Sequence, residues 1–402
     1  MRKILSTLLV ISIVYGCSKN DMQRTYFDNG RLKSEFNYID GIKHGLFKTW
    51  HENGELESTG NYKEGVIITN EGWYDNGQIY YEATFKAGEK DGLYRKYHKN
   101  GQLYYEGHYA VGKRERLFKT WHDNGQLESE GDYKAEKREG LFKTWHENGE
   151  LESTGNYKEG VIITNEGWYD NGQIYYEATF KAGEKDGLYR KYHKNGQLYY
   201  EGHYVEGEKE GLFHKWYENG QLSDAKNYQR SLWSGVWTRW HKNGQLKSIG
   251  NYTLGKREGL FKTWHENGQL ESEGDYKAEK REGLFKTWHE NGQLESEGDY
   301  KAEKREGLFK TWHENGQLEF EGNYKHGAKN GLSKAYQDGG QLLYKAIFKA
   351  GKKDGLFQKY HKNGQLYYKG HYKVGKKEGL FKIWDKKGQL KSEYKYYHGV
   401  KR

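Results

Sequence analysis

The sequence of 402 residues contains no proline and a single cysteine, Cys17. Proline cannot donate to a sheet ladder, so its absence is typical of a chain built mostly of paired strands. One cysteine excludes an intrachain disulfide as a source of stability. Apolar residues make up only 34% of the chain, but aromatic residues reach 16%, which disordered chains do not show. We therefore expect a folded but thin structure, stabilised by many small aromatic contacts.

The most regular feature of the chain is a turn-forming Asn-Gly pair that recurs about every 24 residues. A fixed period in this range indicates a repeat architecture, which grows by stacking units. Asn is replaced only before Gly340 and Gly388. The glycines of the series are Gly30, Gly54, Gly77, Gly101, Gly125, Gly149, Gly172, Gly196, Gly220, Gly244, Gly268, Gly292, Gly316, Gly340, Gly364 and Gly388.

Each Asn-Gly pair stands between two short segments rich in aromatic residues and Thr, a pattern that predicts a β-hairpin. In the unit that starts at Gly45, the predicted strands are residues 46–51 and 55–62. We favour a three-residue loop, 52–54, with Gly54 in a left-handed conformation, over a strict two-residue turn. The charged segments between hairpins are short, so consecutive hairpins should pair as a meander.

The favoured register opposes Trp50 to Leu56 and Leu46 to Gly60. It places Leu46, Trp50, Leu56 and Tyr62 on one face of the sheet, and it leaves Phe47 with the polar residues of the other face. Because a glycine inside a strand often marks a place where something packs on bare backbone, we expect a neighbouring aromatic ring to cover Gly60.

Two further patterns concern the array as a whole. Residues 45–109 recur without substitution as residues 140–204, which indicates recent duplication. The least regular stretch is residues 223–240, which we interpret either as a kink or special contact surface or as drift within an older repeat.

The first residues have a different character. Arg2 and Lys3 precede an apolar run over residues 4–14, which is too short to span a membrane but suits a signal peptide. The segment resembles a bacterial lipoprotein signal, whose processing leaves a lipidated cysteine, here Cys17, as the new first residue. The alternative is an ordinary secretory signal with an incidental cysteine.

This pattern predicts three parts: a signal peptide (1–16), a short tether (17–25) and the repeat domain (26–402). It also predicts an envelope-anchored lipoprotein, or a secreted or periplasmic protein if Cys17 is not lipidated.

The C-terminal part of the array is strongly basic. Residues 323–402 hold 20 Lys and Arg against 5 Asp and Glu, although the whole chain carries only +9. Such asymmetry suggests an interaction surface, and we favour attraction to lipid head groups or an acidic polysaccharide. Lysines between rings also suit single-stranded nucleic acid, but an exported protein is not expected to meet it. The candidate binding residues are Lys352, Lys353, Tyr360, Lys376, Lys377 and Trp384.

No residue pattern predicts catalysis. Ten histidines share one repeat position, but successive copies should lie two strands, about 10 Å, apart, too far to share a metal ion. We interpret them as part of a solvated face. No nucleotide-binding, hydrolase or zinc motif occurs. We therefore expect neither enzymatic activity nor a cofactor or metal.

Three recurring motifs carry a family resemblance: Asn-Gly-Gln-Leu, Glu-Gly-Asn/Asp-Tyr-Lys and Gly-Leu-Phe-Lys-x-Trp. Over about residues 26–398 the chain resembles the bacterial MORN-repeat variant family, many of whose members are labelled YwqK-type antitoxins of toxin–antitoxin systems. The resemblance implies an elongated sheet used for binding or scaffolding, with membranes, lipid head groups or proteins as partners. Residues 72–81 also resemble the aromatic repeats of cell-wall-binding modules, which place aromatic cages between hairpins to hold choline or sugar.

The expected fold is therefore all-β, an elongated, twisted, single-layer antiparallel meander of about sixteen hairpins. The leading functional hypothesis is a non-enzymatic, envelope-anchored binding or scaffold lipoprotein that engages a protein or an anionic envelope surface. The alternatives are an antitoxin with a toxin partner and a carbohydrate-binding repeat module.

Overall fold

The computed structural model describes residues 19–402. The predicted signal peptide and Cys17 lie outside the described residues, so both remain predictions. The described part is all-β, as expected: its 33 strands belong to one antiparallel sheet, and residues 19–402 contain no helix. The chain divides into two units, of which the first ends at Gly183 and the second begins at Glu184.

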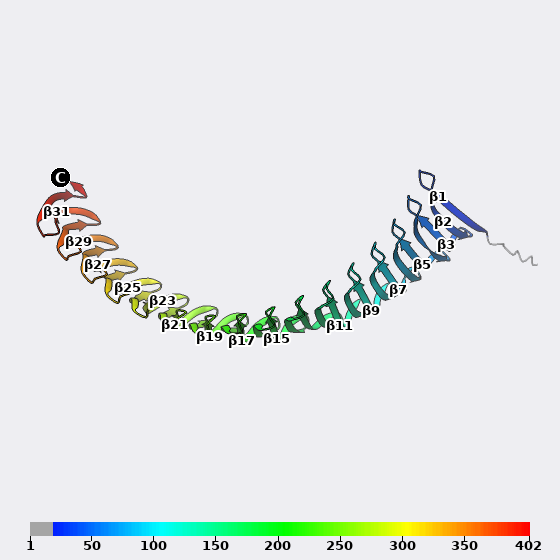
Figure 1. Ribbon diagram of the computed structural model, residues 1–402, viewed down its shortest axis with the longest axis horizontal. Helices are drawn as coiled ribbons and strands as arrows, with labels where there is room; N and C mark the ends of the chain where they lie inside the picture. The colour runs from blue at the N-terminus through cyan, green and yellow to red at the C-terminus, as the bar shows by residue number, and fades with distance from the viewer. Residues whose placement is uncertain (1–18) are drawn as a thin grey trace, which may run out of the picture. The chain divides into compact units, whose positions relative to one another are not determined.

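In the first unit each strand pairs with the next along the chain, and Figure 1 shows these hairpins in series. Its strands are β1 Asn20–Tyr26, β2 Leu32–Ile39, β3 Ile42–Trp50, β4 Leu56–Lys63, β5 Val66–Trp73, β6 Ile79–Lys86, β7 Glu89–Tyr97, β8 Leu103–Ala110, β9 Lys113–Trp121, β10 Leu127–Lys134, β11 Lys137–Trp145, β12 Leu151–Lys158, β13 Val161–Trp168 and β14 Ile174–Lys181.

The second unit repeats this meander and ends in a two-residue strand. Its strands are β15 Glu184–Tyr192, β16 Leu198–Val205, β17 Glu208–Trp216, β18 Leu222–Gln229, β19 Leu232–Trp240, β20 Leu246–Thr253, β21 Lys256–Trp264, β22 Leu270–Lys277, β23 Lys280–Trp288, β24 Leu294–Lys301, β25 Lys304–Trp312, β26 Leu318–Lys325, β27 Ala328–Tyr336, β28 Leu342–Lys349, β29 Lys352–Tyr360, β30 Leu366–Lys373, β31 Lys376–Trp384, β32 Leu390–Tyr397 and β33 Val400–Lys401.

The array begins earlier than predicted. Residues 20–25, expected in a tether, belong to β1, which pairs with β2 from Asn20 opposite Ile39 to Tyr26 opposite Leu32. The first Asn-Gly loop therefore joins two full strands, as every later one does.

The Asn-Gly loop has the predicted three-residue form. The His51 N–H donates to the Glu55 carbonyl at 2.9 Å, and the Gly54 N–H donates to the His51 carbonyl at 2.8 Å. Gly54 has a φ of 94°, which glycine adopts without strain. Trp50 lies opposite Leu56, as predicted.

Beyond that pair the predicted register is wrong by one residue. A register shift next to Trp50 sets Leu46 opposite Asn61 and Phe47 opposite Gly60. Phe47 is consequently buried, at 5% exposed, whereas Leu46 is 44% exposed. A Cβ at Gly60 would come within 2.8 Å of Phe47 Cε1. The larger apolar side chain thus takes the side of the sheet where glycine leaves room for it.

Rings over glycines form the core on this face, which confirms the expected aromatic cover. The hydrogens of Gly131 face the ring of Phe142, which comes from the following strand β11. Phe118, Tyr133, Phe142 and Tyr157 follow one another with ring centroids 5.1 to 5.2 Å apart. Such edge-to-face contacts add to the stabilisation that burial provides.

The turns that join hairpins are two residues long. Ala135 and Glu136 both have positive φ, 49° and 72°, which strains residues with a side chain. The Glu136 carboxylate accepts hydrogen bonds from the Arg114 backbone N–H and from its Nε, the latter at 2.9 Å. This contact joins the turn to the start of β9, the strand that follows the preceding connection between hairpins.

Candidate binding groove

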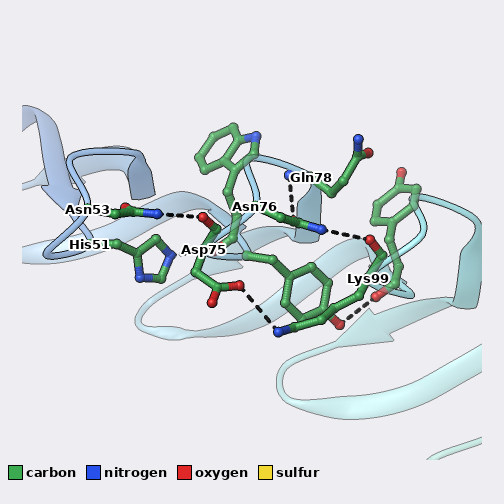
Figure 2. Close-up of polar contacts among 9 residues, drawn as sticks. His51, Asn53, Asp75, Asn76, Gln78 and Lys99 are labelled. Carbon is green, nitrogen blue, oxygen red and sulfur yellow. Dashed lines mark hydrogen bonds and ion pairs between the residues drawn. The ribbon is translucent and has the colours of Figure 1, made fainter.

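In most hairpins the Asn-Gly loop is tied to the loop of the next hairpin by two side chains. His51 Nε2 lies 3.0 Å from the Trp73 carbonyl oxygen, and Asn53 Nδ2 donates to the Asp75 carbonyl at 2.6 Å (Figure 2). We call this pair of contacts the clasp. Both contacts span 22 residues, so the clasp joins equivalent positions of neighbouring hairpins.

The clasp corrects the interpretation of the histidines as part of a solvated face. All ten are at least partly buried, and His241 is only 7% exposed. The reason is the stacking of the loops, which brings the carbonyl of the following hairpin within reach of the ring. The same contact is made by His98, His122, His146, His193, His241, His265, His289 and His361, and Tyr74 and Tyr217 make it through their hydroxyls.

The clasp is interrupted in the hairpin of β27 and β28. His313 Nε2 and Gln337 Nε2 are buried without a hydrogen-bond partner, and His313 Nε2 lies 3.7 Å from Asp338 Oδ1. Gln337 stands at the repeat position of the histidines, and Gly339 stands where other loops have the clasp asparagine. One contact into this loop remains, from Asn315 Nδ2 to the Asp338 carbonyl at 2.8 Å.

Three backbone carbonyls consequently lack a side-chain donor that their counterparts have. They are the carbonyls of Tyr336, Tyr360 and Lys362. By the spacing of the intact hairpins, His313 would donate to Tyr336, Gln337 to Tyr360, and an asparagine at position 339 to Lys362. In an intact hairpin the corresponding acceptors are Trp384, which receives His361 at 2.9 Å, and Lys386, which receives Asn363 at 2.7 Å.

A groove of about 720 Å³ opens at this interruption. We call it the interrupted groove. Its volume falls in the range of small-molecule sites. Glu319 and Phe320 of β26, Asp338 of the loop and Tyr344 of β28 contribute to its walls, together with the residues His313 and Gln337. Partial burial raises the pKa of Tyr344, so its hydroxyl stays protonated at neutral pH.

The first unit has a groove of about 590 Å³ at the same repeat positions, between His51 and Lys99. Several of its polar groups are already paired within the chain. The Tyr74 hydroxyl donates to the Tyr97 carbonyl at 2.9 Å, and Asp75 forms a 3.3 Å ion pair with Lys99 (Figure 2). We call this site the paired groove.

The aromatic residues that resembled cell-wall-binding repeats do meet in the paired groove. The ring centroids of Tyr74 and Tyr80 lie 4.8 Å apart, and those of Tyr80 and Tyr81 lie 5.4 Å apart. Tyr81 also receives a hydrogen bond from Asn70 at 2.6 Å.

The predicted basic site does not come together as one cluster. Lys352 and Lys376 begin β29 and β31, whereas Tyr360 and Trp384 end these strands. A nine-residue strand separates its two ends by about 26 Å. The rings and the exposed lysines therefore lie at opposite ends of these strands.

Two of the six predicted residues serve the core. Lys353 Nζ lies 3.9 Å from the centroid of Phe357, and Lys377 Nζ lies 4.7 Å from that of Tyr396. Burial lowers the pKa of Lys353. Lys352 and Lys376 are the exposed members of the set.

The irregular stretch around Trp233 folds as an ordinary hairpin step between β18 and β19. Its side chains enclose a groove of about 380 Å³. Lys226 Nζ lies 4.9 and 5.0 Å from the rings of Trp233 and Trp237 and 3.6 Å from Asp224 Oδ1. The chain's own cation therefore lies over both indoles, whose centroids are 5.6 Å apart.

Sequence reasoning missed the clasp and its interruption. The available signal was Gly339 before Gly340, together with Gln337 at a histidine position. Among residues 19–402, no group of three or more His, Cys, Asp or Glu is placed to hold a metal ion. Within the same residues, no helix meets the length and apolarity needed to cross a bilayer.

Comparison with known families identifies the repeat. A family model described as MORN repeat variant matches fourteen segments, which together make up more than half of the chain. They are residues 22–40, 43–64, 69–87, 90–110, 117–135, 138–159, 164–182, 185–206, 233–253, 257–278, 281–302, 305–326, 353–373 and 377–397. The model leaves out residues 327–352, which contain the interrupted loop.

No curated protein sequence matches the chain. Among solved structures, TcdB2-TccC3 is 11% identical with a TM-score of 0.16, and the match covers 93% of this chain and 27% of the other. The Tc holotoxin pore of Photorhabdus luminescens is 10% identical with a TM-score of 0.16, covering 94% and 26%. The chain thus spans about a quarter of the length of these proteins, and TM-scores this low support no conclusion.

Proposed function

The chain belongs to the MORN repeat variant family, and we propose that it is a non-enzymatic binding or scaffold protein of the bacterial cell envelope. Lipidation at Cys17 would anchor it to a membrane, and the repeat array would engage a protein partner or an anionic envelope surface. The role needs neither a cofactor nor nucleic acid.

One observation carries this proposal: the face opposite the aromatic core presents an exposed leucine in most hairpins. These leucines are between 39% and 52% exposed, and exposed apolar residues that recur along a surface mark interaction sites. We call them the leucine row. Its members are Leu46, Leu117, Leu141 and, in the second unit, Leu188, Leu212, Leu260, Leu284, Leu308, Leu332 and Leu380.

Charged pairs accompany the row. Lys262 lies two residues beyond Leu260 in β21 and therefore on the same face. Its Nζ is 3.3 Å from Glu273 of the opposing strand. Because these charges are already paired across strands, the leucines supply the main unsatisfied surface, and a long partner can follow it from hairpin to hairpin.

The basic C-terminal part adds attraction to anionic surfaces. Lys352 and Lys376 remain exposed at the strand starts. Exposed positive charge near an anionic surface attracts it within about a Debye length.

A double substitution tests the binding role. Leu284→Asp with Leu308→Asp places charges in the leucine row without touching the core, so the fold should persist. We expect full-length wild type to retain a defined envelope component in cross-linking and pull-down, and the double variant to lose it. Val374→Asp, at an exposed turn position that is 59% exposed, is the control. Equal recovery with all three proteins would contradict the proposed role.

Replacing Cys17 with Ala tests the anchor separately. The variant should move from the membrane fraction to the soluble fraction. Unchanged fractionation would remove the anchoring part of the proposal and leave the binding role standing.

A further inference from the structure

We infer that the leucine-row face of β27 to β31 binds an acidic protein segment, which places one carboxylate on Lys345 and another on Lys369. We call these two lysines, with Gln358 between them, the lysine patch. The inference rests on the proposed binding function and names the chemistry of the partner at one place in the second unit. It follows from the charges beside the leucine row, from the apolar side chains next to them and from the acidic residues that bound the patch.

Beside the leucine row, the strands β21 to β27 carry alternating lysine and glutamate, one side chain per strand. Lys262 opposes Glu273, and Glu273 opposes Lys286 of the next hairpin. Ion pairs of 3.3, 3.6 and 2.8 Å close three steps of this row. We call the row the charge ladder. It continues in register through Glu297, Lys310, Glu321 and Lys334.

The alternation breaks after Lys334, because lysine takes the next two glutamate positions. Lys345 of β28 stands opposite Lys334, and Lys369 of β30 stands opposite Lys382 of β31. Gln358 of β29 occupies the lysine position between them. Like charges directly opposite each other across strands are destabilising. The chain therefore places two cations where the preceding hairpins supply an anion.

The two lysines of the patch are unpaired, whereas the lysines at its ends are not. Lys334 Nζ lies 2.8 Å from Glu321 Oε1 of β26, and Lys382 Nζ lies 3.4 Å from Glu393 Oε2 of β32. In residues 19–402, neither lysine of the patch forms an ion pair, since the side chains opposite them are lysine or glutamine. Because β28 and β30 are two strand spacings apart, the two lysines start from backbone positions about 10 Å apart. A partner with two carboxylates at that spacing restores the alternation.

Exposed apolar side chains lie beside the patch on the same face. Ile347 follows Lys345 by two residues in β28, and residues two apart in a strand share a face. Ile347 is 41% exposed, and it opposes Leu332, which is 45% exposed. Leu380, two residues before Lys382 in β31, is 47% exposed. A purely anionic ligand would leave these side chains in water, so the partner carries apolar groups next to its carboxylates.

Acidic side chains bound the patch and disfavour extended anionic partners. Glu321 stands at one end of the cationic stretch, and Glu393 at the other is 51% exposed. Beyond Glu321 the same face carries Asp299 opposite Leu284. A nucleic acid, a polyphosphate chain or an anionic membrane would extend over these carboxylates and be repelled by them. A protein segment can place its acidic residues at the patch alone.

The sheet also limits how the segment binds. The strands β27 to β31 are interior strands, each paired with a neighbour on both sides. Addition of a partner strand needs a free edge. The segment therefore lies across the strands and is held by side chains.

Fluorescence anisotropy with the full-length chain tests the inference. The probe is a short labelled peptide that alternates leucine with glutamate. Two matched peptides alternate leucine with lysine and serine with glutamate, and polyphosphate and phosphatidylglycerol vesicles are titrated in parallel. We expect the leucine–glutamate peptide to bind about tenfold or more tightly than either matched peptide. Equal affinity for the three peptides, or tighter binding of polyphosphate or of the vesicles, would overturn the assignment.

Variants drawn from the chain's own repeats locate the site. Lys345→Glu with Lys369→Glu restores the glutamates of the charge ladder, so the fold should persist and its urea midpoint should rise. Binding of the leucine–glutamate peptide should weaken about tenfold or more. Lys349→Glu with Lys373→Glu makes the same change of charge at the exposed ends of the same two strands, and it should weaken binding much less. Equal losses in the two double variants would mean attraction by net charge alone and would overturn the site.

The outcomes separate this inference from the proposed function. A chain that retains its envelope component but does not bind the acidic peptide would remove only the lysine patch. A chain that binds the peptide at the patch but retains no envelope component would remove the scaffold role and leave the patch. Dimerisation of the wild type that the Lys345→Glu, Lys369→Glu variant abolishes would assign the patch to a second copy of the chain and overturn the inference.

Discussion

The ring of Phe309 lies over Gly298, and this contact predicts that substitutions at the two positions depend on each other. Phe309 is only 3% exposed. The three atoms nearest to a Cβ built at Gly298 all belong to Phe309. An alanine at position 298 would therefore overlap the ring and force it to move.

The magnitudes follow from packing. Overpacking of this kind costs about 1–3 kcal/mol, offset by the gain of about 0.5–1 kcal/mol from replacing glycine inside a strand. Gly298→Ala should thus destabilise by about 1 kcal/mol, and Phe309→Ala by about 3–5 kcal/mol. In the Phe309→Ala background the overlap is gone, so Gly298→Ala should stabilise. The coupling is about 2 kcal/mol, as expected for residues in contact.

Native-state hydrogen exchange of β24 and β25 in the full-length chain is the appropriate assay, because a long repeat array need not unfold in two states. The same cycle at Gly274 and Phe285, which have the same geometry, should repeat the result. If Gly298→Ala has the same sign in both backgrounds, the ring-over-glycine account of the core is refuted.

Three other predictions concern strain, charge and the clasp. Arg116 has a φ of 68° where most hairpins have glycine, so Arg116→Gly should stabilise by about 1 kcal/mol; a lower urea midpoint would refute this. The hydrogen bond from the Arg114 backbone N–H lowers the pKa of Glu136. The ionised carboxylate therefore stabilises the fold at pH values above its unfolded pKa of about 4.3, and this contribution is lost as the pH falls through the lower pKa of the folded state. The stability gap between wild type and Glu136→Gln should therefore close on acidification in that window, and a gap that stays constant would argue against it. His289→Ala should lower the free energy of unfolding by about 0.5–1.5 kcal/mol, the contribution of its clasp hydrogen bond. Gln337→Ala removes no clasp hydrogen bond and should lower the free energy of unfolding by less in the same assay. Equal losses for the two variants would count against the clasp.

Local turn chemistry made the fold predictable. Asn-Gly needs a left-handed glycine, and Gly54 has one, so the hairpins and their period followed from the sequence. The ring over Gly60 was also predictable, because a glycine inside a strand leaves a gap that a neighbour can fill.

The register was not predictable in the same way. Alternation of side chains favoured Leu46 for the core, but the shift near Trp50 exchanges the faces and buries Phe47. A one-residue shift is hard to predict from the sequence where two adjacent residues, here Leu46 and Phe47, are both apolar and either could be buried.

The functional surfaces were predicted least well. The partner of His51 is a carbonyl 22 residues away, which only the stacking of loops brings near. The six candidate residues of the basic end do not form one cluster, because strand length separates Lys352 from Tyr360, and their binding role stays a prediction. The interrupted groove depends on contacts that are missing at Gln337 and Gly339, and a missing contact is visible only against its intact counterparts.

Hydrogen exchange of the loop amides tests the central claim, that a clasp joins most neighbouring hairpins and is interrupted at the loop of residues 337–340. Amides in residues 337–343 should exchange faster than those in the matching residues 289–295, and Gln337→His with Gly339→Asn should slow them to the rate of the matching loop. Equal protection of the two loops in the wild type, or no change in the repaired variant, would contradict the account.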